Sequence, residues 1–508
     1  MIWRWPGQGA QSPVLRARCT LVAGAGAWQG RGVPVSPRYR PDPRHQELGE
    51  GFADVVAAAR FPRHILRFRN DRWAARVGLD SLTPDEWEAH LAGFAPLPDN
   101  LRQPLALRYH GHQFRSYNPA LGDGRGFLFA QLRDAVDGRL LDLGTKGSGA
   151  TPYARGGDGR LTLKGGVREL LATEQLEALG VDTSKSLSLF ETGERLVRGD
   201  EPSPTRSSVL VRLSHGHIRF GSFQRLAYLG ERDRLARLLA HSVALFYPDA
   251  QRQGLAATAG EFLRAVAERA AATAAAWMVA GFVHGVLNTD NMNISGESFD
   301  YGPWRWLPRF DPGFTAAYFD ESGLYAFGRQ PSVVLWNLER LAESLLALAP
   351  EAVLVDSLRV YAPTYAAELV RRFLARLGLR PRGVGPDEVL VDAAYAFLHA
   401  SQVEYDRFFF DWYGGEASQA RALAGPAGGQ YQGEAFVELR RAWSEHEPTA
   451  PQRLADPYYA GAGPCALLID EVEALWSAIA GPDDWAPLTA KIAEIRRFGA
   501  LHGHAPAA

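Results

Sequence analysis

The longest regular hydrophobic pattern of the chain comes directly before a short, strongly polar segment. Apolar residues recur at helical spacing over residues 258–282, and the pattern fails near Gly281. The segment that follows, residues 284–300, reads HGVLNTDNMNISGESFD and contains two Asp and three Asn. We therefore predict a long helix, a loop that starts at His284, and a strand-turn-strand around Ser295-Gly296-Glu297.

Shorter patterns predict the elements on either side of this centre. Residues 140–146 have the pattern of a strand that ends in Lys146, residues 164–179 form a helix that is apolar on more than one face, and residues 209–223 alternate as a strand. A helical pattern begins at Phe52, and Thr83 opens a capping box for a helix through about Leu91. Further helices are expected over residues 331–348 and 364–413.

Both ends of the chain have a different composition. Residues 1–45 are rich in Gly, Pro and Arg without periodicity, which predicts a flexible extension. Residues 414–433 are rich in Gly, Ala and Pro and are expected to be a linker before a last helical segment, from Ala435 to about Leu501.

Composition limits the possible partners. The 508 residues are 46% hydrophobic and 22% charged with a formal net charge of −2, so no global field attracts nucleic acid or an anionic membrane. No run of 18 apolar residues occurs. The two cysteines, Cys19 and Cys465, exclude a disulfide framework and a cysteine-based zinc site. We expect a cytoplasmic monomer without nucleic-acid or membrane partners.

The polar segment has the spacing of a metal-nucleotide site. His284 and Asn291 keep the separation of the protein-kinase catalytic loop H-R-D-x-x-x-x-N, but Val286 stands where that loop has its Asp. Asp290 lies beside Asn291, and Asp300-Tyr301-Gly302 follows at the place of D-F-G. This spacing predicts that Asn291 and Asp300 bind Mg²⁺ and that Asp290 is the base, although Asp/Asn-rich loops are more often simple turns.

Several segments resemble one known family. HGVLNTDNM, DYGPW, FDPGF and YAFGRQPSVVLWNL are similar to the selenoprotein O family of pseudokinase-fold protein adenylyltransferases, and the resemblance is strong over residues 109–338. It implies an α+β, protein-kinase-like two-lobed fold. It also implies transfer of AMP from ATP to Ser, Thr or Tyr hydroxyls of proteins, with release of pyrophosphate and with Mg²⁺ or Mn²⁺ as cofactor.

The resemblance also implies which residues bind the nucleotide. Lys146 is expected to contact phosphates and to pair with a helix glutamate, as in kinases. The family pattern nominates Glu169 for that pairing, whereas helical periodicity keeps Glu174 as the alternative. The remaining nucleotide contacts are expected from a Gly-rich turn, a later G-D-G-R segment, a pair of arginines and the metal-binding aspartate: Gly122, Gly124, Arg125, Asp158, Gly159, Arg212, Arg219 and Asp300.

The resulting domain plan has four parts. It comprises the flexible extension 1–45, an N-lobe with the nucleotide-binding turn at 46–230, a C-lobe with the catalytic loop at 231–413, and a linker with a C-terminal helical segment at 414–508. Two rival functions stay open: a kinase that transfers the γ-phosphate, and an inactive nucleotide-binding scaffold.

Overall fold

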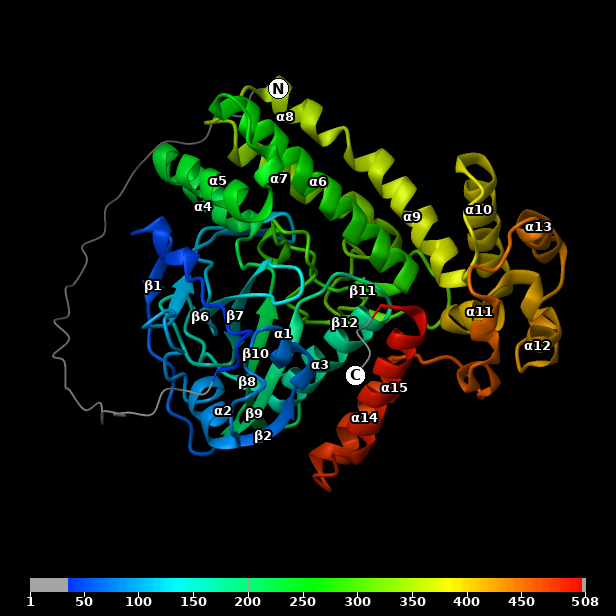
Figure 1. Ribbon diagram of the computed structural model, residues 1–508, viewed down its shortest axis with the longest axis horizontal. Coiled ribbons are helices and arrows are strands. Elements are labelled where there is room, and N and C mark those ends of the chain that lie inside the picture. The colour runs from blue at the N-terminus through cyan, green and yellow to red at the C-terminus, as the bar shows by residue number, and fades with distance from the viewer. Residues whose placement is uncertain (1–34, 200, 505–508) are drawn as a thin grey trace.

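A curled antiparallel sheet holds the N-terminal half of the chain together (Figure 1). The computed structural model describes residues 35–199 and 201–504. The strand order is β1-β3-β6-β7-β10-β9-β2, with β8 paired to β10, and every pairing is antiparallel. The strands are β1 (Ala53–Val55), β2 (Ile65–Arg69), β3 (Leu105–Leu107), β6 (Leu128–Arg133), β7 (Leu140–Lys146), β8 (Leu161–Thr162), β9 (Lys185–Leu196) and β10 (Thr205–Ser214).

The centre of the sheet is buried on both faces. All seven residues of β7 are buried, as predicted for a strand over 140–146. One face is covered by α3 (Leu163–Ala178), whose N-cap Thr162 accepts a hydrogen bond from the N–H of Gly165. Because α3 also packs against the C-terminal helix α15 (Ala486–His502), it is apolar on more than one side, as its sequence indicated.

A helical half is built around α6 (Leu255–Ala280), which runs through the upper part of Figure 1. It ends where predicted, at Gly281, whose φ of 68° suits glycine as a left-handed cap. Its neighbours include α7, α8 and α9. The other helices are α1 (Asp71–Arg76), α2 (Pro84–Leu91), α4 (Phe220–Tyr228), α5 (Arg232–Phe246), α7 (Gln330–Ser344), α8 (Glu351–Leu358), α9 (Tyr361–Leu377), α10 (Val384–Ser401), α11 (Tyr405–Asp411), α12 (Gln419–Ala424), α13 (Glu434–Trp443) and α14 (Ile469–Ala480).

Four local predictions were wrong. The pattern from Phe52 forms strands β1 and β2 before the first helix. The alternation over 209–223 is a strand only to Ser214, after which α4 begins at Phe220. His284 ends a short strand, β11 (Phe282–His284), which pairs with β12 (Trp304–Trp306). Residues 294–295 form a turn, which the Gly296 N–H closes by donating to Asn293 O at 3.1 Å, and only isolated bridges adjoin it in place of the expected strands.

The segment predicted as a linker is folded. Residues 414–433 contain α12 and short 3-10 helices, and Ala422 and Tyr431 are buried in the core around α10 and α11. The Tyr431 hydroxyl donates to Asp411 Oδ2 at 2.6 Å. The linker prediction is therefore wrong, because aromatic packing outweighs the Gly-rich composition here.

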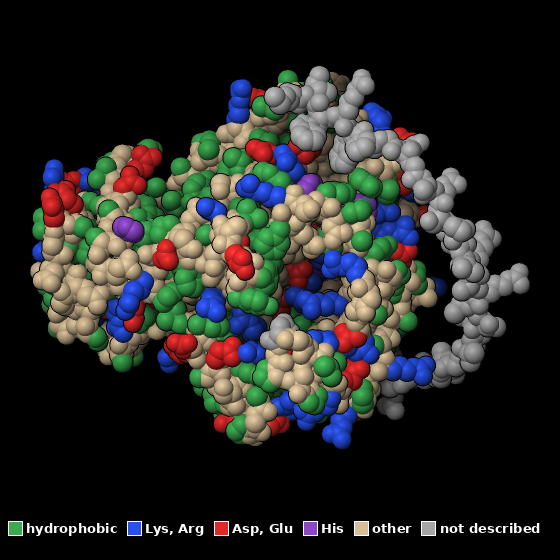
Figure 2. Space-filling view, turned by 180° about the vertical axis from the view of Figure 1, so that it is seen from behind, with side chains coloured by type: hydrophobic (Ala, Val, Ile, Leu, Met, Phe, Trp, Pro, Cys, Tyr) green, Lys and Arg blue, Asp and Glu red, His purple; other side chains and the backbone are tan. Residues whose placement is uncertain are grey.

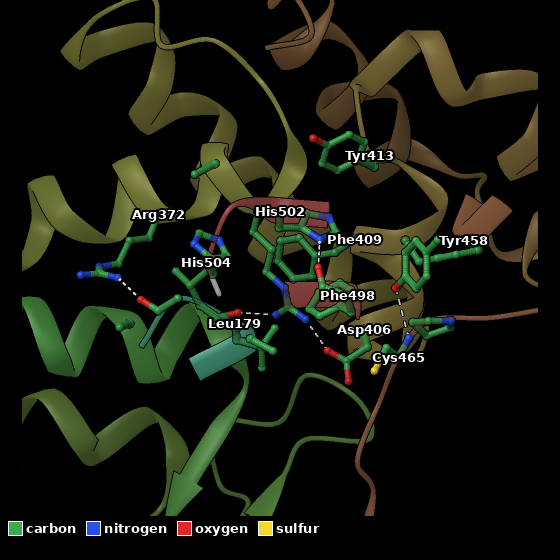
Figure 3. Close-up of a pocket in the computed structure, with 18 of the residues that line it drawn as sticks. Leu179, Arg372, Asp406, Phe409, Tyr413, Tyr458, Cys465, Phe498, His502 and His504 are labelled. Atoms are coloured by element: carbon green, nitrogen blue, oxygen red, sulfur yellow. Dashed lines mark hydrogen bonds and ion pairs between the residues drawn. The ribbon is translucent and has the colours of Figure 1, made fainter. Parts of the chain in front are cut away.

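The C-terminal helices return to the N-terminal sheet. Arg496 on α15 donates two hydrogen bonds to Glu174 on α3, at 2.8 and 2.7 Å. A cavity of about 80 Å³ remains where α15 meets α3, α9 and α11 (Figure 3). In it Asp406 pairs with Arg376, and His502 lies beside Phe498. Residues 414–508 thus close the fold rather than extend from it.

The predicted N-terminal extension is only partly described. Residues 1–34 lie outside the described part, but residues 35–45 lie against the sheet, where Pro41 bridges to Leu132 and the Asp42 N–H donates to Gln131 O at 3.1 Å. No helix within residues 35–199 and 201–504 is long and apolar enough to cross a membrane.

Candidate functional site

A cavity of about 670 Å³ lies between the sheet and the loop of residues 285–303. Its size suits a small-molecule ligand. Figure 2 shows a hollow near the middle of one face, where blue and red side chains gather and green ones form part of the border. Eleven of the twelve predicted site residues line the cavity: Gly122, Gly124, Arg125, Lys146, Asp158, Gly159, Arg212, Arg219, Asp290, Asn291 and Asp300. The twelfth, Glu169, lies behind Lys146.

The Gly-rich turn is shaped by close packing. A Cβ at Gly122 would lie 2.3 Å from the Tyr153 ring, and one at Gly124 would lie 2.7 Å from the Tyr153 carbonyl oxygen. Neither glycine has a positive φ. The turn therefore needs glycine for close approach and not for a left-handed backbone, because the segment around Tyr153 lies directly against it.

Lys146 is held at the end of β7 by two carboxylates. Its Nζ makes a short contact with Glu169 on α3 and lies 2.8 Å from Asp300 Oδ1. Arg212 on β10 also reaches Asp300 Oδ1, at 3.1 Å. Burial alone would raise the pKa of Asp300, but Lys146, Arg212 and the nearby Arg219 hold it well below its usual value.

The two candidate helix glutamates have different partners. Glu169 contacts Lys146, whereas Glu174 is bound by Arg496 and, at 3.4 Å, by Arg72. Glu174 therefore anchors the C-terminal helix to α3, and the alternative pairing of Glu174 with Lys146 does not occur.

Asp290 lies in a one-turn 3-10 helix, Thr289–Asn291, with its side chain turned into the cavity. The residue is only 7% exposed, and its Oδ1 has no hydrogen-bond partner among the described residues. Burial raises the pKa of Asp290 to about 6, against the opposing charge of Arg219. A buried carboxylate that lacks a strong partner has the character of a proton acceptor.

Asn291 and Asp300 offer oxygen atoms of the kind that bind Mg²⁺. Asn291 Nδ2 donates to the carbonyl of Val286 at 2.8 Å, which leaves its amide oxygen free to act as a ligand. Asp300 offers an ionised carboxylate from a residue with φ of 63°. No cluster of three His, Cys, Asp or Glu suited to a metal occurs in the described ranges. Mg²⁺ does not need one, because substrate phosphates and water complete its shell.

The loop that carries these residues is tied to the sheet. The His215 N–H, just after β10, donates to Glu297 Oε2 at 2.8 Å, and Asn293 bridges to Arg219. Burial raises the pKa of Glu297 to about 8. Val286, at the place of the kinase base, lines the cavity with a side chain that cannot accept a proton. The loop is thus fixed to the sheet, and Asp290 Oδ1 in it is a fully buried carboxylate oxygen without a partner among the described residues.

Four further residues that line the cavity were not predicted from the sequence: Tyr109, Gln113, Asp123 and Arg198. Arg219 forms an ion pair with Asp123 at 3.2 Å and lies 4.2 Å from the Tyr109 ring. Arg198 pairs with Asp158 at 2.9 Å. Asp123 stands between Gly122 and Gly124 of the predicted Gly-rich turn, and Gln113 lies shortly before that turn, so their position was a usable signal. Arg198 had none, because only the fold brings it to Asp158.

Comparisons with known proteins agree with the resemblance. The family model described as "Protein adenylyltransferase SelO" matches residues 38–496, well beyond the 109–338 expected. A "Protein nucleotidyltransferase YdiU" of Gloeobacter violaceus is 46% identical over 472 residues, which cover 90% of this chain and 95% of the relative. A protein of the same name from Synechocystis is 45% identical over 88% of this chain and 95% of the relative. Another, from Vibrio cholerae, is 37% identical over 71% of this chain and 73% of the relative.

Proposed function

We propose that this chain, which belongs to the protein adenylyltransferase SelO family, transfers AMP from ATP to Ser, Thr or Tyr hydroxyls of proteins and releases pyrophosphate. One observation carries the proposal: the same cavity holds a group of cations suited to a triphosphate and, beside Asn291, the buried carboxylate of Asp290.

In this reaction the acceptor oxygen attacks the α-phosphorus of ATP. A bond forms between them, the bond from the α-phosphorus to the bridging oxygen breaks, and pyrophosphate leaves with the electron pair. Asp290 takes the proton of the acceptor hydroxyl, and Lys146, Arg212 and Arg219 neutralise the phosphates. Asn291 and Asp300 would hold Mg²⁺ or Mn²⁺, which supplies further charge neutralisation when bound.

We also infer a protein-kinase-like two-lobed arrangement, with an N-lobe over 46–230 and a C-lobe over 231–413. The Lys146–Glu169 pair beside a loop that carries Asn291 and Asp300 supports it, because kinases combine a strand lysine, a helix glutamate and two metal ligands in this way. The low cysteine content supports a cytoplasmic location.

The test uses ATP labelled at either the α- or the γ-phosphate. The purified chain is incubated with a bacterial lysate and Mg²⁺, with Asp290→Ala as the control. We expect α-label on protein, and none with the control. Transfer of γ-label alone would establish a kinase instead, and binding of ATP without any transfer would establish an inactive scaffold.

Two matched substitutions on α3 distinguish a residue of the nucleotide site from a residue that only stabilises the fold. Glu169→Gln is expected to weaken ATP binding about tenfold, because Lys146 loses one of its two charged partners and keeps only Asp300. Glu174→Gln is expected to leave ATP binding unchanged but to lower the free energy of unfolding by about 3 kcal/mol, since Arg496 and Arg72 lose a buried carboxylate. Calorimetry with ATP and thermal unfolding measure the two effects, and a loss of ATP affinity in Glu174→Gln would contradict the assignment.

A further inference from the structure

Aromatic side chains gather on the surface next to Asp290. Four aromatic residues are exposed in the part of the chain that the structure describes, and three of them form one cluster: Phe114 (38% exposed), Tyr318 (83%) and Phe319 (47%). The ring centroids of Phe114 and Phe319 are 5.9 Å apart, and those of Tyr318 and Phe319 are 5.2 Å apart. We call these three residues the aromatic patch. Clustered exposed rings of this kind mark interaction surfaces.

The patch is bonded to the loop that carries Asp290. The hairpin of β4 (Gly111–Gln113) and β5 (Ser116–Asn118) donates to three successive residues of that loop. The Phe114 N–H lies 3.2 Å from Asn288 Oδ1. The His112 N–H donates to Thr289 Oγ1 at 2.7 Å, and Gln113 Nε2 lies 3.5 Å from Asp290 Oδ2. Phe114 is therefore fixed at the edge of the cavity, beside the proposed base.

The exposure of the other two rings is also built into the fold. Asp320, directly after Phe319, is 5% exposed and accepts the N–H groups of Leu324 and Tyr325 at 2.8 and 2.7 Å. The Tyr325 hydroxyl in turn donates to Asn288 Oδ1 at 2.6 Å. Tyr318 and Phe319 thus stand on an anchored turn that joins the same loop.

The hairpin holds Phe114 in a left-handed backbone conformation that residues other than glycine rarely adopt. Gln113 pairs with Ser116, so Phe114 and Arg115 form a two-residue turn, with φ of 49° and 63°. Such turns favour Asn-Gly, because other residues are strained at positive φ. An aromatic side chain in this position, 38% exposed and directly after Gln113 of the cavity lining, is available for a contact with something outside the chain.

We propose that the aromatic patch binds a large apolar side chain of the acceptor protein, within a few residues of the hydroxyl that receives AMP. The inference rests on the proposed function, which requires a protein segment to reach Asp290 from outside. An extended segment advances about 3.3 Å per residue, so a neighbour of the acceptor residue can reach rings that adjoin the base. The cations Lys146, Arg212 and Arg219 lie inside the cavity, whereas the patch offers apolar surface.

The test uses two synthetic peptides that differ in one respect. Each has a single Ser in a Gly/Lys background, and one carries Phe at the residues flanking that Ser whereas the other carries Gly. With α-labelled ATP and Mg²⁺, the full-length chain is expected to modify the Phe peptide with a kcat/KM about tenfold higher. The double variant Tyr318→Ser, Phe319→Ser should lose this preference and keep the rate on the Gly peptide and the affinity for ATP. Val437→Ser, which removes an apolar side chain 62% exposed on α13, should keep the preference.

The other outcomes are distinct. Equal labelling of both peptides by the unaltered chain overturns the inference and leaves the proposed function standing. No α-label on either peptide or on lysate proteins overturns both. If the double variant changes the particle mass in sedimentation and not the peptide preference, the patch is a contact between copies of the chain, and the inference is wrong.

Discussion

Replacing Asp290 by alanine is expected to lower AMP transfer by a factor on the order of 10² to 10⁴, with ATP binding in Mg²⁺ nearly unchanged. The side chain is 7% exposed, its Oδ1 has no hydrogen-bond partner among the described residues, and its Oδ2 lies 3.5 Å from Gln113 Nε2. Within the described part of the chain it forms no ion pair with the cations of the cavity, so its loss should remove the proton acceptor and leave the phosphate contacts in place. Single-turnover transfer of α-label and calorimetry with ATP measure the two quantities.

Asp290→Asn and Asp300→Ala complete this comparison. The amide keeps the shape of the carboxylate without its basicity, so Asp290→Asn should match the alanine variant. Asp300→Ala should instead abolish the Mg²⁺ dependence of ATP binding, because Asp300 is the carboxylate that Lys146 and Arg212 hold ionised in the cavity. Equal losses of ATP affinity in the Asp290 and Asp300 variants would mean that Asp290 is a metal ligand or a structural residue.

Local sequence patterns correctly predicted two kinds of element: those fixed by residues close in sequence, and those buried on all sides. The strand that ends at Lys146, the capped helix that starts after Thr83, and the end of α6 at Gly281 were confirmed, because each depends on periodicity or on a cap. The prediction of a strand over residues 215–223 was wrong, because apolar and polar residues can alternate before and at the start of a short amphipathic helix as they do in a strand. The packing of residues 414–433 was missed, because Tyr431 finds its partner Asp411 only in the folded chain.

Those candidate site residues were predictable whose side-chain type and spacing already indicate their chemistry. Asp290, Asn291 and Asp300 follow from spacing in one segment, and the family resemblance supplied the glycines and arginines. The choice between Glu169 and Glu174 could not be made from periodicity, because both face buried surroundings on α3. Arg496, 322 residues from Glu174, decides it. The contact of Gln113 with Asp290 was likewise hidden by a separation of 177 residues.

Arg219 is a buried cation of the cavity that contacts one carboxylate and two aromatic rings. It lies where β10 has ended and α4 begins, is 3% exposed, and pairs with Asp123 at 3.2 Å. The rings of Tyr109 and Phe299 lie 4.2 and 5.1 Å from its guanidinium, and its Nε has no acceptor among the described residues. A planar guanidinium held against two rings and one carboxylate can offer its remaining donors to phosphate oxygens in a fixed direction.

Arg219→Lys is therefore expected to lower transfer of α-label by a factor on the order of 10², as for the loss of one directed donor to developing charge. Lysine keeps the charge beside Asp123 but replaces the fork by a single ammonium, so folding should be largely preserved. Arg225→Lys is the matched control: Arg225 lies six residues further on, in α4, is half-buried, and donates to Gly51 O at 3.1 Å, outside the cavity. It should retain full transfer. If both variants transfer α-label at the rate of the unaltered chain while Arg219→Lys unfolds at a lower temperature, then Arg219 is a structural cation, and other cations of the cavity bind the phosphates.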